Sequence, residues 1–202
     1  MTEQEVTIKK KLIIEEDMLP VNSVSTQIIN KGTGAGGSNT NKNGLSYEEK
    51  TDLTFEFTKI NNDELSYNEK NFIKSNKTSL HKYMNSINEK NQEILPAAGC
   101  KSPDEAYINN ASNSLFIIEK KFQQGPGSVD EKIQTGPFKK EHYGELFPNY
   151  KIHYIYCLSD WFKRDEYSSV LKYLKKNNIP IFWGNDTNYK SEIIQYIFNN
   201  SL

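Results

Sequence analysis

Residues 103–123 read PDEAYINNASNSLFIIEKKFQ, and this stretch decides the fold class. Pro103 to Asn109 is predicted to be a short strand, and the polar segment NNASN at 109–113 is typical of a turn. From Ser114 to Gln123 the chain is first apolar and then polar, which indicates a buried strand with a polar end. The stretch therefore predicts a β-hairpin.

The sequence that follows the hairpin alternates between helix and strand. QGPG at 124–127 ends the second strand, and Ser128 with Glu131 forms a capping box that begins a helix. The elements expected after it are a strand at Lys151–Leu158, a helix at Asp160–Asn178, a strand at Ile179–Trp183 and a helix at 189–200. Their order predicts an α/β fold with a mixed central β-sheet flanked by helices, in which the hairpin leads into parallel crossovers.

The chain before the hairpin is predicted to consist of helices and a loop. The segment GTGAGGSNTNKNGLS at 32–46 is rich in Gly, Asn and Ser, which is typical of a loop. Ser46 and Glu49 form a second capping box, so a helix is expected to begin near Ser46. Apolar residues at near-helical spacing predict a further helix over 68–95.

Length and composition fit one domain with a modest core. The chain has 202 residues and a formal net charge of −1, so we expect a single domain over 1–202, with a helical and loop part at 1–95 and an α/β core at 96–202. No apolar run approaches the roughly 18 residues of a membrane-spanning helix, and the N-terminus lacks the apolar run of a secretory signal. The two cysteines, Cys100 and Cys157, are too few for a disulfide framework and form no CxxC pair. The reducing cytoplasm is therefore the expected location.

The charged residues of the hairpin carry the chemistry. Side chains alternate along a strand, so Glu119 and Lys121 share one face while Lys120 points to the other, and the hairpin brings Asp104 alongside Glu119. Glu105 is expected to point away from Asp104. Two adjacent carboxylates repel each other, and a divalent cation removes that repulsion. A surface hairpin with charge pairs between its strands is the alternative interpretation.

The same residues resemble a known nuclease pattern. Pro-Asp, then 14 residues, then Glu-x-Lys is the signature of the PD-(D/E)xK nucleases, and the flanks GCKSPDEAYI and FIIEKKFQQGPGSVDEKIQTGPFK look like a group of type II restriction endonucleases. Three further segments are similar to parts of such enzymes: GAGGSNTNKNGLSYEEKT (34–51), DWFK (160–163) and IPIFWGND (179–186). The resemblance covers roughly residues 30–190.

The resemblance implies a restriction-endonuclease-like core and a Mg²⁺ site. It implies that Asp104 and Glu119 bind the metal together with the backbone carbonyl of Lys120, and that Lys121 positions or polarises the attacking water. Gln123 would support the metal site or touch the phosphate. The implied reaction is hydrolysis of phosphodiester bonds in double-stranded DNA, which leaves 5′-phosphate and 3′-hydroxyl ends.

An acidic residue of the first helix often completes such sites, as the resemblance further implies. Glu48 is the matching candidate, because Glu49 already has a structural role as the capping-box partner of Ser46. The choice between Glu48 and Glu49 stays open at this point.

Several polar residues are candidates for DNA contacts. They are Ser38, Asn39, Asn41, Lys42, Asn43, Ser128 and Lys132. Ser128 opens a helix whose N-terminus could hold a phosphate, and Lys132, Lys139 and Lys140 form either a solvated face or a phosphate-contacting edge. A net charge near zero does not exclude DNA as a partner, because a basic cleft can lie on a neutral protein.

Cleavage of both strands of a palindromic site favours a homodimer, and a restriction enzyme implies a companion DNA methyltransferase that acts on the same site. Two alternatives remain open: a repair, nicking or junction-resolving nuclease of the same fold, and a DNA-binding module that does not cleave. Gly32-x-Gly34-x-x-Gly37 also matches a dinucleotide fingerprint, but no βαβ pattern surrounds it. No membrane partner is expected.

Overall fold

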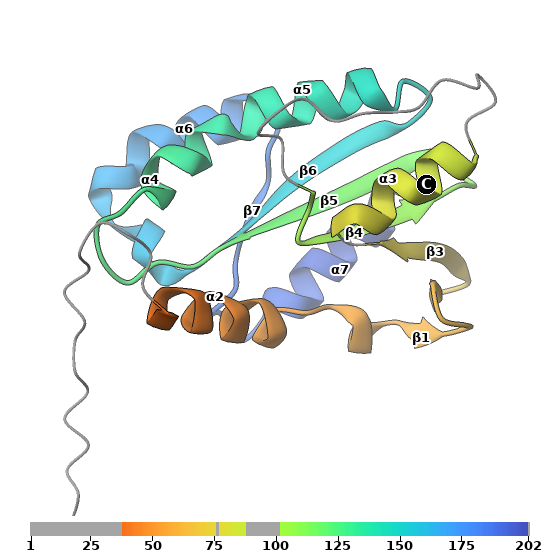
Figure 1. Cartoon of the computed structure of the whole chain (residues 1–202), viewed down its shortest axis with the longest axis horizontal. Coiled ribbons are helices and arrows are strands. Elements are labelled where there is room, and N and C mark those ends of the chain that lie inside the picture. Colours follow the sequence, from red (N-terminus) through yellow and green to blue (C-terminus); the bar gives the residue numbers. More distant parts are fainter. Residues whose placement is uncertain (1–37, 76, 88–101, 202) are drawn as a thin grey trace, which may run out of the picture. The chain divides into compact units, whose positions relative to one another are not determined.

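A mixed sheet forms the centre of the computed structural model, in which residues 38–75, 77–87 and 102–201 are described (Figure 1). Within these residues the sheet has seven strands in the order β1-β2-β3-β4-β5-β6-β7. The strands are β1 (Thr58–Lys59), β2 (Glu64–Tyr67), β3 (Lys70–Ser75), β4 (Glu105–Asn109), β5 (Ser114–Lys121), β6 (Lys151–Leu158) and β7 (Ile181–Trp183). All the described residues belong to one unit, Thr33–Leu202.

The predicted hairpin and crossovers are confirmed. The four pairs from β1–β2 to β4–β5 are antiparallel, and β6 lies parallel to both β5 and β7. The register of the hairpin pairs Glu105 with Ile118 and Asn109 with Ser114, so the turn spans the four residues 110–113. The antiparallel hairpin and the parallel pairs of β6 together make the mixed sheet of an α/β fold that the sequence predicts.

Helices cover both faces of the sheet. They are α2 (Ser38–Lys50), α3 (Lys77–Ser86), α4 (Val129–Lys132), α5 (Gly136–Leu146), α6 (Ser168–Lys176) and α7 (Tyr189–Asn199). Short 3-10 helices lie at η1 (Thr54–Glu56), η2 (Ile133–Thr135), η3 (Asp160–Lys163) and η4 (Asp165–Tyr167). Figure 1 shows α5 and α6 on one side of the sheet and α2 and α7 on the other.

The alternation of β5 separates two hydrophobic cores. Leu115 and Ile117 point into the core beneath α3, α5 and α6, whereas Phe116 and Ile118 point into the core beneath α2 and α7. All four side chains are fully buried. Because β5 is apolar on both faces up to Ile118, the charged residues Glu119 and Lys120 that follow are buried beside core residues of β6.

The first described helix differs from its prediction. Helix α2 spans Ser38–Lys50, so Ser46 lies inside it and is not its N-cap. The helix runs through this polar segment although Lys42, Asn43, Leu45 and Ser46 are exposed, and its buried contacts begin at Tyr47. Tyr47 is buried against Cys157, and a Cβ at Gly184 would clash with the Tyr47 hydroxyl, which shows how closely α2 approaches the end of β7. Residues 32–37 of the predicted loop lie outside the described residues.

The helix predicted over 68–95 is wrong in its first part. Residues 70–75 form strand β3, α3 begins at Lys77, and residues 88–95 lie outside the described residues. Asn68 and Glu69 both have positive φ, 45° and 66°, and make the two-residue turn that joins β2 to β3. Phe72 and Ile73 fit the helical spacing of the apolar residues that follow them. They form a strand instead, because β3 pairs with β2 on one side and with β4 on the other.

Two further local predictions need correction. The helix expected at Asp160–Asn178 is broken, because Arg164 is extended (φ −67°, ψ 149°) between η3 and η4, and the α-helix begins only at Ser168. Ser128 does precede α4, but its side chain makes no capping hydrogen bond, so the capping box predicted from Ser128 and Glu131 is absent as well. The last strand and the last helix lie where the sequence predicts them.

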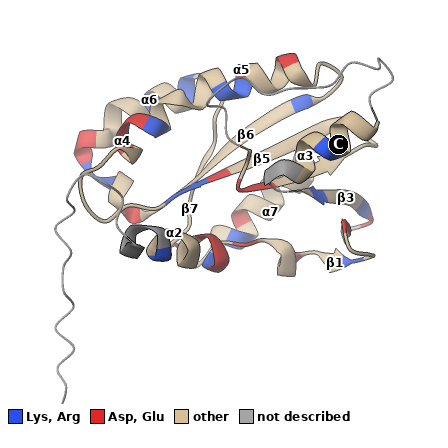
Figure 2. Cartoon of the chain, in the orientation of Figure 1, with Lys and Arg blue, Asp and Glu red and all other residues tan. Residues whose placement is uncertain are grey.

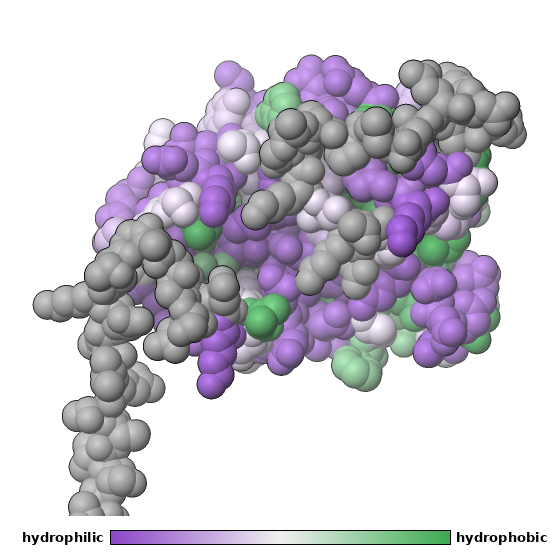
Figure 3. Space-filling view, viewed as in Figure 1, coloured by the Kyte–Doolittle hydropathy of each residue, from purple (hydrophilic) through white to green (hydrophobic). Residues whose placement is uncertain are grey.

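In the described part of the chain, none of the helices combines the length and the apolar character needed to cross a bilayer. On the face shown in Figure 3, hydrophilic residues predominate and hydrophobic residues form small, separate patches.

A buried histidine gives the fold a pH dependence. The His153 ring stacks on Phe116 with centroids 4.6 Å apart, its Nδ1 lies 3.1 Å from the Tyr196 hydroxyl, and its Nε2 has no hydrogen-bond partner among the described residues. Burial, with the nearby charges of Lys151 and Lys140, lowers the pKa of His153 to about 4. The folded protein therefore keeps this imidazole neutral where the unfolded chain, with a pKa near ~6.5, takes up a proton.

We expect the free energy of unfolding to fall by about 1–2 kcal/mol between pH 7 and pH 5, because protonation favours the unfolded state in this range. Urea unfolding at the two pH values measures the loss, and His153→Gln should remove most of it. An equal loss in both proteins would contradict the assignment to His153.

Candidate active site

The hairpin brings the predicted carboxylates together. Asp104 precedes β4 and lies one position beyond the pair Glu105–Ile118, which places it opposite Glu119 on β5. The backbone N–H of Lys120 donates a hydrogen bond of 2.7 Å to Asp104 Oδ2. Asp104 is thus fixed to the neighbouring strand by a backbone donor, and it shares the face of Glu119 as the alternation predicts.

Three oxygens converge on the ammonium group of Lys121. Its Nζ lies 2.6 Å from Glu119 Oε1 and 3.8 Å from Asp104 Oδ2, and it donates a 3.1 Å hydrogen bond to the carbonyl of Lys120. The Lys121 side chain is 16% exposed and that of Glu119 8%, so the cluster is largely but not fully buried. One cation at this place lies near two carboxylates.

A second ammonium group reaches the same carboxylate from a helix. Lys139, in the first turn of α5, lies with its Nζ 3.0 Å from Glu119 Oε1. The sequence predicts Lys139 on a face that is either solvated or in contact with phosphate, and does not predict its contact with Glu119. No sequence signal sets this contact, since it depends on how α5 packs on β6, the neighbour of β5.

The two carboxyl groups differ in their electrostatics. Burial alone would raise the pKa of Glu119, but the charges of Lys121 and Lys139 and their hydrogen bonds outweigh burial and hold it below its usual value. The pKa of Asp104 is raised, first by burial and then by the charge of Glu119, and Lys121 compensates only in part. The two carboxyl groups therefore differ in which form the site favours, with the charged form favoured at Glu119 and the neutral form at Asp104.

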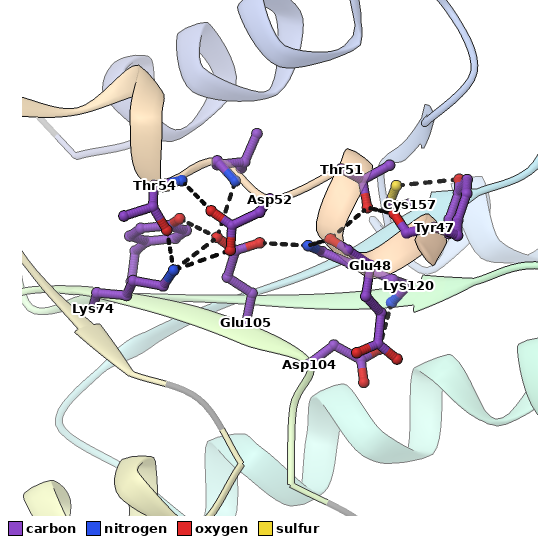
Figure 4. A network of polar contacts seen from close by, with 12 residues as sticks. Tyr47, Glu48, Thr51, Asp52, Thr54, Lys74, Asp104, Glu105, Lys120 and Cys157 are labelled. Atoms are coloured by element: carbon purple, nitrogen blue, oxygen red, sulfur yellow. Dashed lines mark hydrogen bonds and ion pairs between the residues drawn. The ribbon is translucent and has the colours of Figure 1, made fainter. Parts of the chain in front are cut away.

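Glu48 lies at this site and Glu49 does not. Figure 4 shows the Glu48 side chain extending from α2 toward Asp104, and its charge contributes to the raised pKa of Asp104. Glu49 is exposed on α2. The structure thus places the carboxylate of Glu48, rather than that of Glu49, beside the hairpin.

The opposite face of the hairpin carries a buried ion pair. Glu105 Oε2 and Lys120 Nζ are 2.9 Å apart with side chains 2% and 3% exposed, and Lys120 Nζ also donates a 3.0 Å hydrogen bond to the carbonyl of Glu48 (Figure 4). Glu105 Oε1 accepts hydrogen bonds from the Leu53 amide and the Tyr107 hydroxyl. The prediction that Glu105 and the Lys120 side chain point away from Asp104 is confirmed.

Gln123 contacts the helix that follows rather than the carboxylates. Its Nε2 donates a 3.0 Å hydrogen bond to Asp130 Oδ1, and its backbone N–H and carbonyl both bond to the Ser159 hydroxyl. The buried Oε1 of Gln123 has no hydrogen-bond partner among the described residues. A contact of Gln123 with metal or phosphate remains a prediction.

The candidates for DNA contacts are placed only in part. Lys42 and Asn43 on α2 are exposed, as are Ser128 and Lys132 at the two ends of α4. Ser38, Asn39 and Asn41 belong to α2, and their side chains lie outside the described residues. Figure 2 shows basic segments both on α5 and at the end of β5.

The donor set fits a hard divalent cation. The described residues hold no group of three or more His, Cys, Asp and Glu side chains that could bind a metal ion. The oxygen donors at the hairpin are the carboxylates of Asp104 and Glu119 and the carbonyl of Lys120. Oxygen donors of these kinds are the ligands of Mg²⁺, which keeps several waters and needs few protein ligands. The same three oxygens already surround one cationic atom, Lys121 Nζ, which shows that they can converge on a positive charge.

Comparison of the chain with models of known protein families, with characterised proteins and with solved structures finds no match.

Proposed function

We propose that the chain is a Mg²⁺-dependent, sequence-specific endonuclease of the type II restriction class, with a restriction-endonuclease-like core, that cleaves double-stranded DNA. The observation that carries this proposal is the cluster of Asp104, Glu119, the Lys120 carbonyl and Lys121 at the open end of the hairpin. Its residue types and its alternation are those that the PD-(D/E)xK resemblance requires at these positions. A surface hairpin with simple charge pairs would not need a lysine held by three oxygens.

The chain's own groups divide the work of hydrolysis. Asp104, Glu119 and the carbonyl of Lys120 would hold the ion, with Glu48 nearby as a further carboxylate. Bound Mg²⁺ would neutralise the phosphate and lower the pKa of a water molecule. Lys121 lies between both carboxylates, so it can orient the attacking water and donate a hydrogen bond to the phosphate. The water oxygen forms a bond to phosphorus and gives up a proton to solvent, the P–O3′ bond breaks, and the 3′ oxygen takes up a proton from solvent.

The homodimer and the companion methyltransferase are proposed from the resemblance to type II restriction endonucleases. Cleavage of both strands of a palindromic site favours a homodimer, because the two-fold symmetry of the protein then matches that of the site. A restriction enzyme also implies a companion methyltransferase that protects the same site in the cell's own DNA. A repair, nicking or junction-resolving nuclease would use the same cluster on a different DNA structure.

Digestion of unmodified phage and plasmid DNA tests this proposal. With Mg²⁺ we expect discrete bands that EDTA abolishes, and fragment ends that DNA ligase rejoins without added kinase, because they carry 5′-phosphate and 3′-hydroxyl groups. No cleavage of any duplex by folded protein, with Mg²⁺ or Mn²⁺, would contradict the restriction assignment. Cleavage confined to branched DNA would favour a junction-resolving nuclease, and binding without cleavage would favour a DNA-binding module.

A further inference from the structure

Glu119 has one more cationic partner than the Glu-x-Lys pattern explains. Lys121 Nζ and Lys139 Nζ lie 2.6 Å and 3.0 Å from the same atom, Glu119 Oε1. Lys121 also contacts Asp104 and the Lys120 carbonyl, whereas the ion pair with Glu119 is the contact that the structure gives the Lys139 ammonium. Lys139 therefore depends on Glu119 more than Lys121 does.

The fold holds Lys139 in place. It lies in the first turn of α5, whose first residue, Gly136, packs so tightly on β6 that a Cβ there would come within 2.7 Å of Tyr156 Cε2. One turn further along α5, Tyr143 is buried in the core. The Lys139 side chain is only 14% exposed. Its position above Glu119 thus follows from the helix packing and not from the freedom of a surface lysine.

A cation bound by Glu119 would take away the partner of Lys139. An ammonium group that is largely removed from water is costly unless an anion neutralises it. In a site that binds a phosphodiester, the anion within reach is the phosphate group itself. The two ammonium groups flank the same carboxylate oxygen, so a phosphate at this place would meet both of them.

We propose that Lys139 is a second cationic residue of this site, which neutralises Glu119 in the metal-free protein and contacts a non-bridging oxygen of the scissile phosphate in the loaded one. Only the contact with the scissile phosphate rests on the proposed function. The first half concerns Glu119 and holds for any divalent cation bound there. Lys139 would then stabilise the charge that develops on the phosphate in the transition state.

The matched control is the neighbouring residue. Lys140 has the same length and charge, but its Nζ donates hydrogen bonds to the carbonyls of Asn177 and Asn178, away from Glu119. Lys139→Met and Lys140→Met therefore remove the same charge from adjacent positions of one helix. Lys139→Arg keeps the charge with a different shape.

The first measurement is Mn²⁺ binding to the full-length protein without DNA, by titration calorimetry. Lys139→Met should bind Mn²⁺ about tenfold more tightly than the wild type, because a cation that competes for Glu119 is gone. Lys140→Met should bind as the wild type does. Unchanged or weaker binding by a folded Lys139→Met protein, with thermal unfolding as for the wild type, would overturn the proposal.

The second measurement is single-turnover cleavage at saturating Mg²⁺. Lys139→Met should cleave about 10²-fold more slowly than the wild type although it binds the metal more tightly, and Lys139→Arg should recover part of the rate. A merely structural role would not combine tighter metal binding with slower cleavage. Cleavage by Lys139→Met at the wild-type rate would overturn the phosphate contact. If the wild type cleaves no DNA, the proposed function fails, and Mn²⁺ binding still decides whether Lys139 competes at Glu119.

Discussion

Replacing Lys121 with alanine is expected to lower the single-turnover rate of DNA cleavage by about 10³-fold or more, with DNA binding reduced far less. Lys121 Nζ is the atom on which Glu119 Oε1, Asp104 Oδ2 and the Lys120 carbonyl converge. No neighbouring side chain can take over its position, because Lys139 approaches Glu119 from α5 and contacts neither Asp104 nor the Lys120 carbonyl in the described structure. Single-turnover assays on a mapped site measure the effect.

The control for this experiment is Lys132→Ala. Lys132 is exposed on α4 and makes no ion pair among the described residues, so its loss should change the cleavage rate by less than about tenfold, by way of DNA binding alone. The two variants remove the same charge at different distances from the hairpin. Equal effects of both would mean that Lys121 acts only through the general field of the protein, and would contradict a role at the reacting atoms.

The hairpin and its charged face could be predicted from the sequence because they depend on local rules. Side chains alternate strictly along β5, and a four-residue turn fixes which residue of β4 lies opposite Glu119. Once these are known, Asp104, Glu119 and Lys121 must share a face and Glu105 and Lys120 must share the other. The parallel strand β6 was equally readable, since its eight residues form one uninterrupted run of strand-forming and mainly apolar side chains.

The rest of the site depends on contacts between distant parts of the chain. Strand β3 was hidden because Phe72 and Ile73 also suit a helix, and only the pairing of Ile73 with Ile108 on β4 distinguishes the two. The position of helix α2 depends on Tyr47, which packs against Cys157, 110 residues away. The contact of Lys139 with Glu119 likewise follows from the packing of α5 on β6, the strand next to β5. Local spacing carries no information about any of these contacts.

The largest effect on stability is expected at the buried ion pair behind the site. Lys120→Met should lower the free energy of unfolding by about 3–5 kcal/mol, because it leaves the carboxylate of Glu105 buried without its closest cation. The remaining cation, Lys74, lies 3.8 Å from Glu105 Oε1 and also pairs with Asp52 at 3.1 Å, so it can compensate only in part. Urea unfolding followed by circular dichroism measures the loss.

The double variant Glu105→Leu with Lys120→Met separates the cost of an unpaired charge from the value of the pair. Both charges leave the interior together, so the double variant should regain most of the stability that Lys120→Met loses. The Lys120 backbone amide and carbonyl, which contact Asp104 and Lys121, are present in every variant. A double variant as unstable as Lys120→Met would mean that the pair stabilises through its hydrogen bonds to the Glu48 carbonyl and the Leu53 amide. Recovery of stability together with cleavage would show that the pair serves the fold, and that the hairpin backbone alone positions the catalytic face.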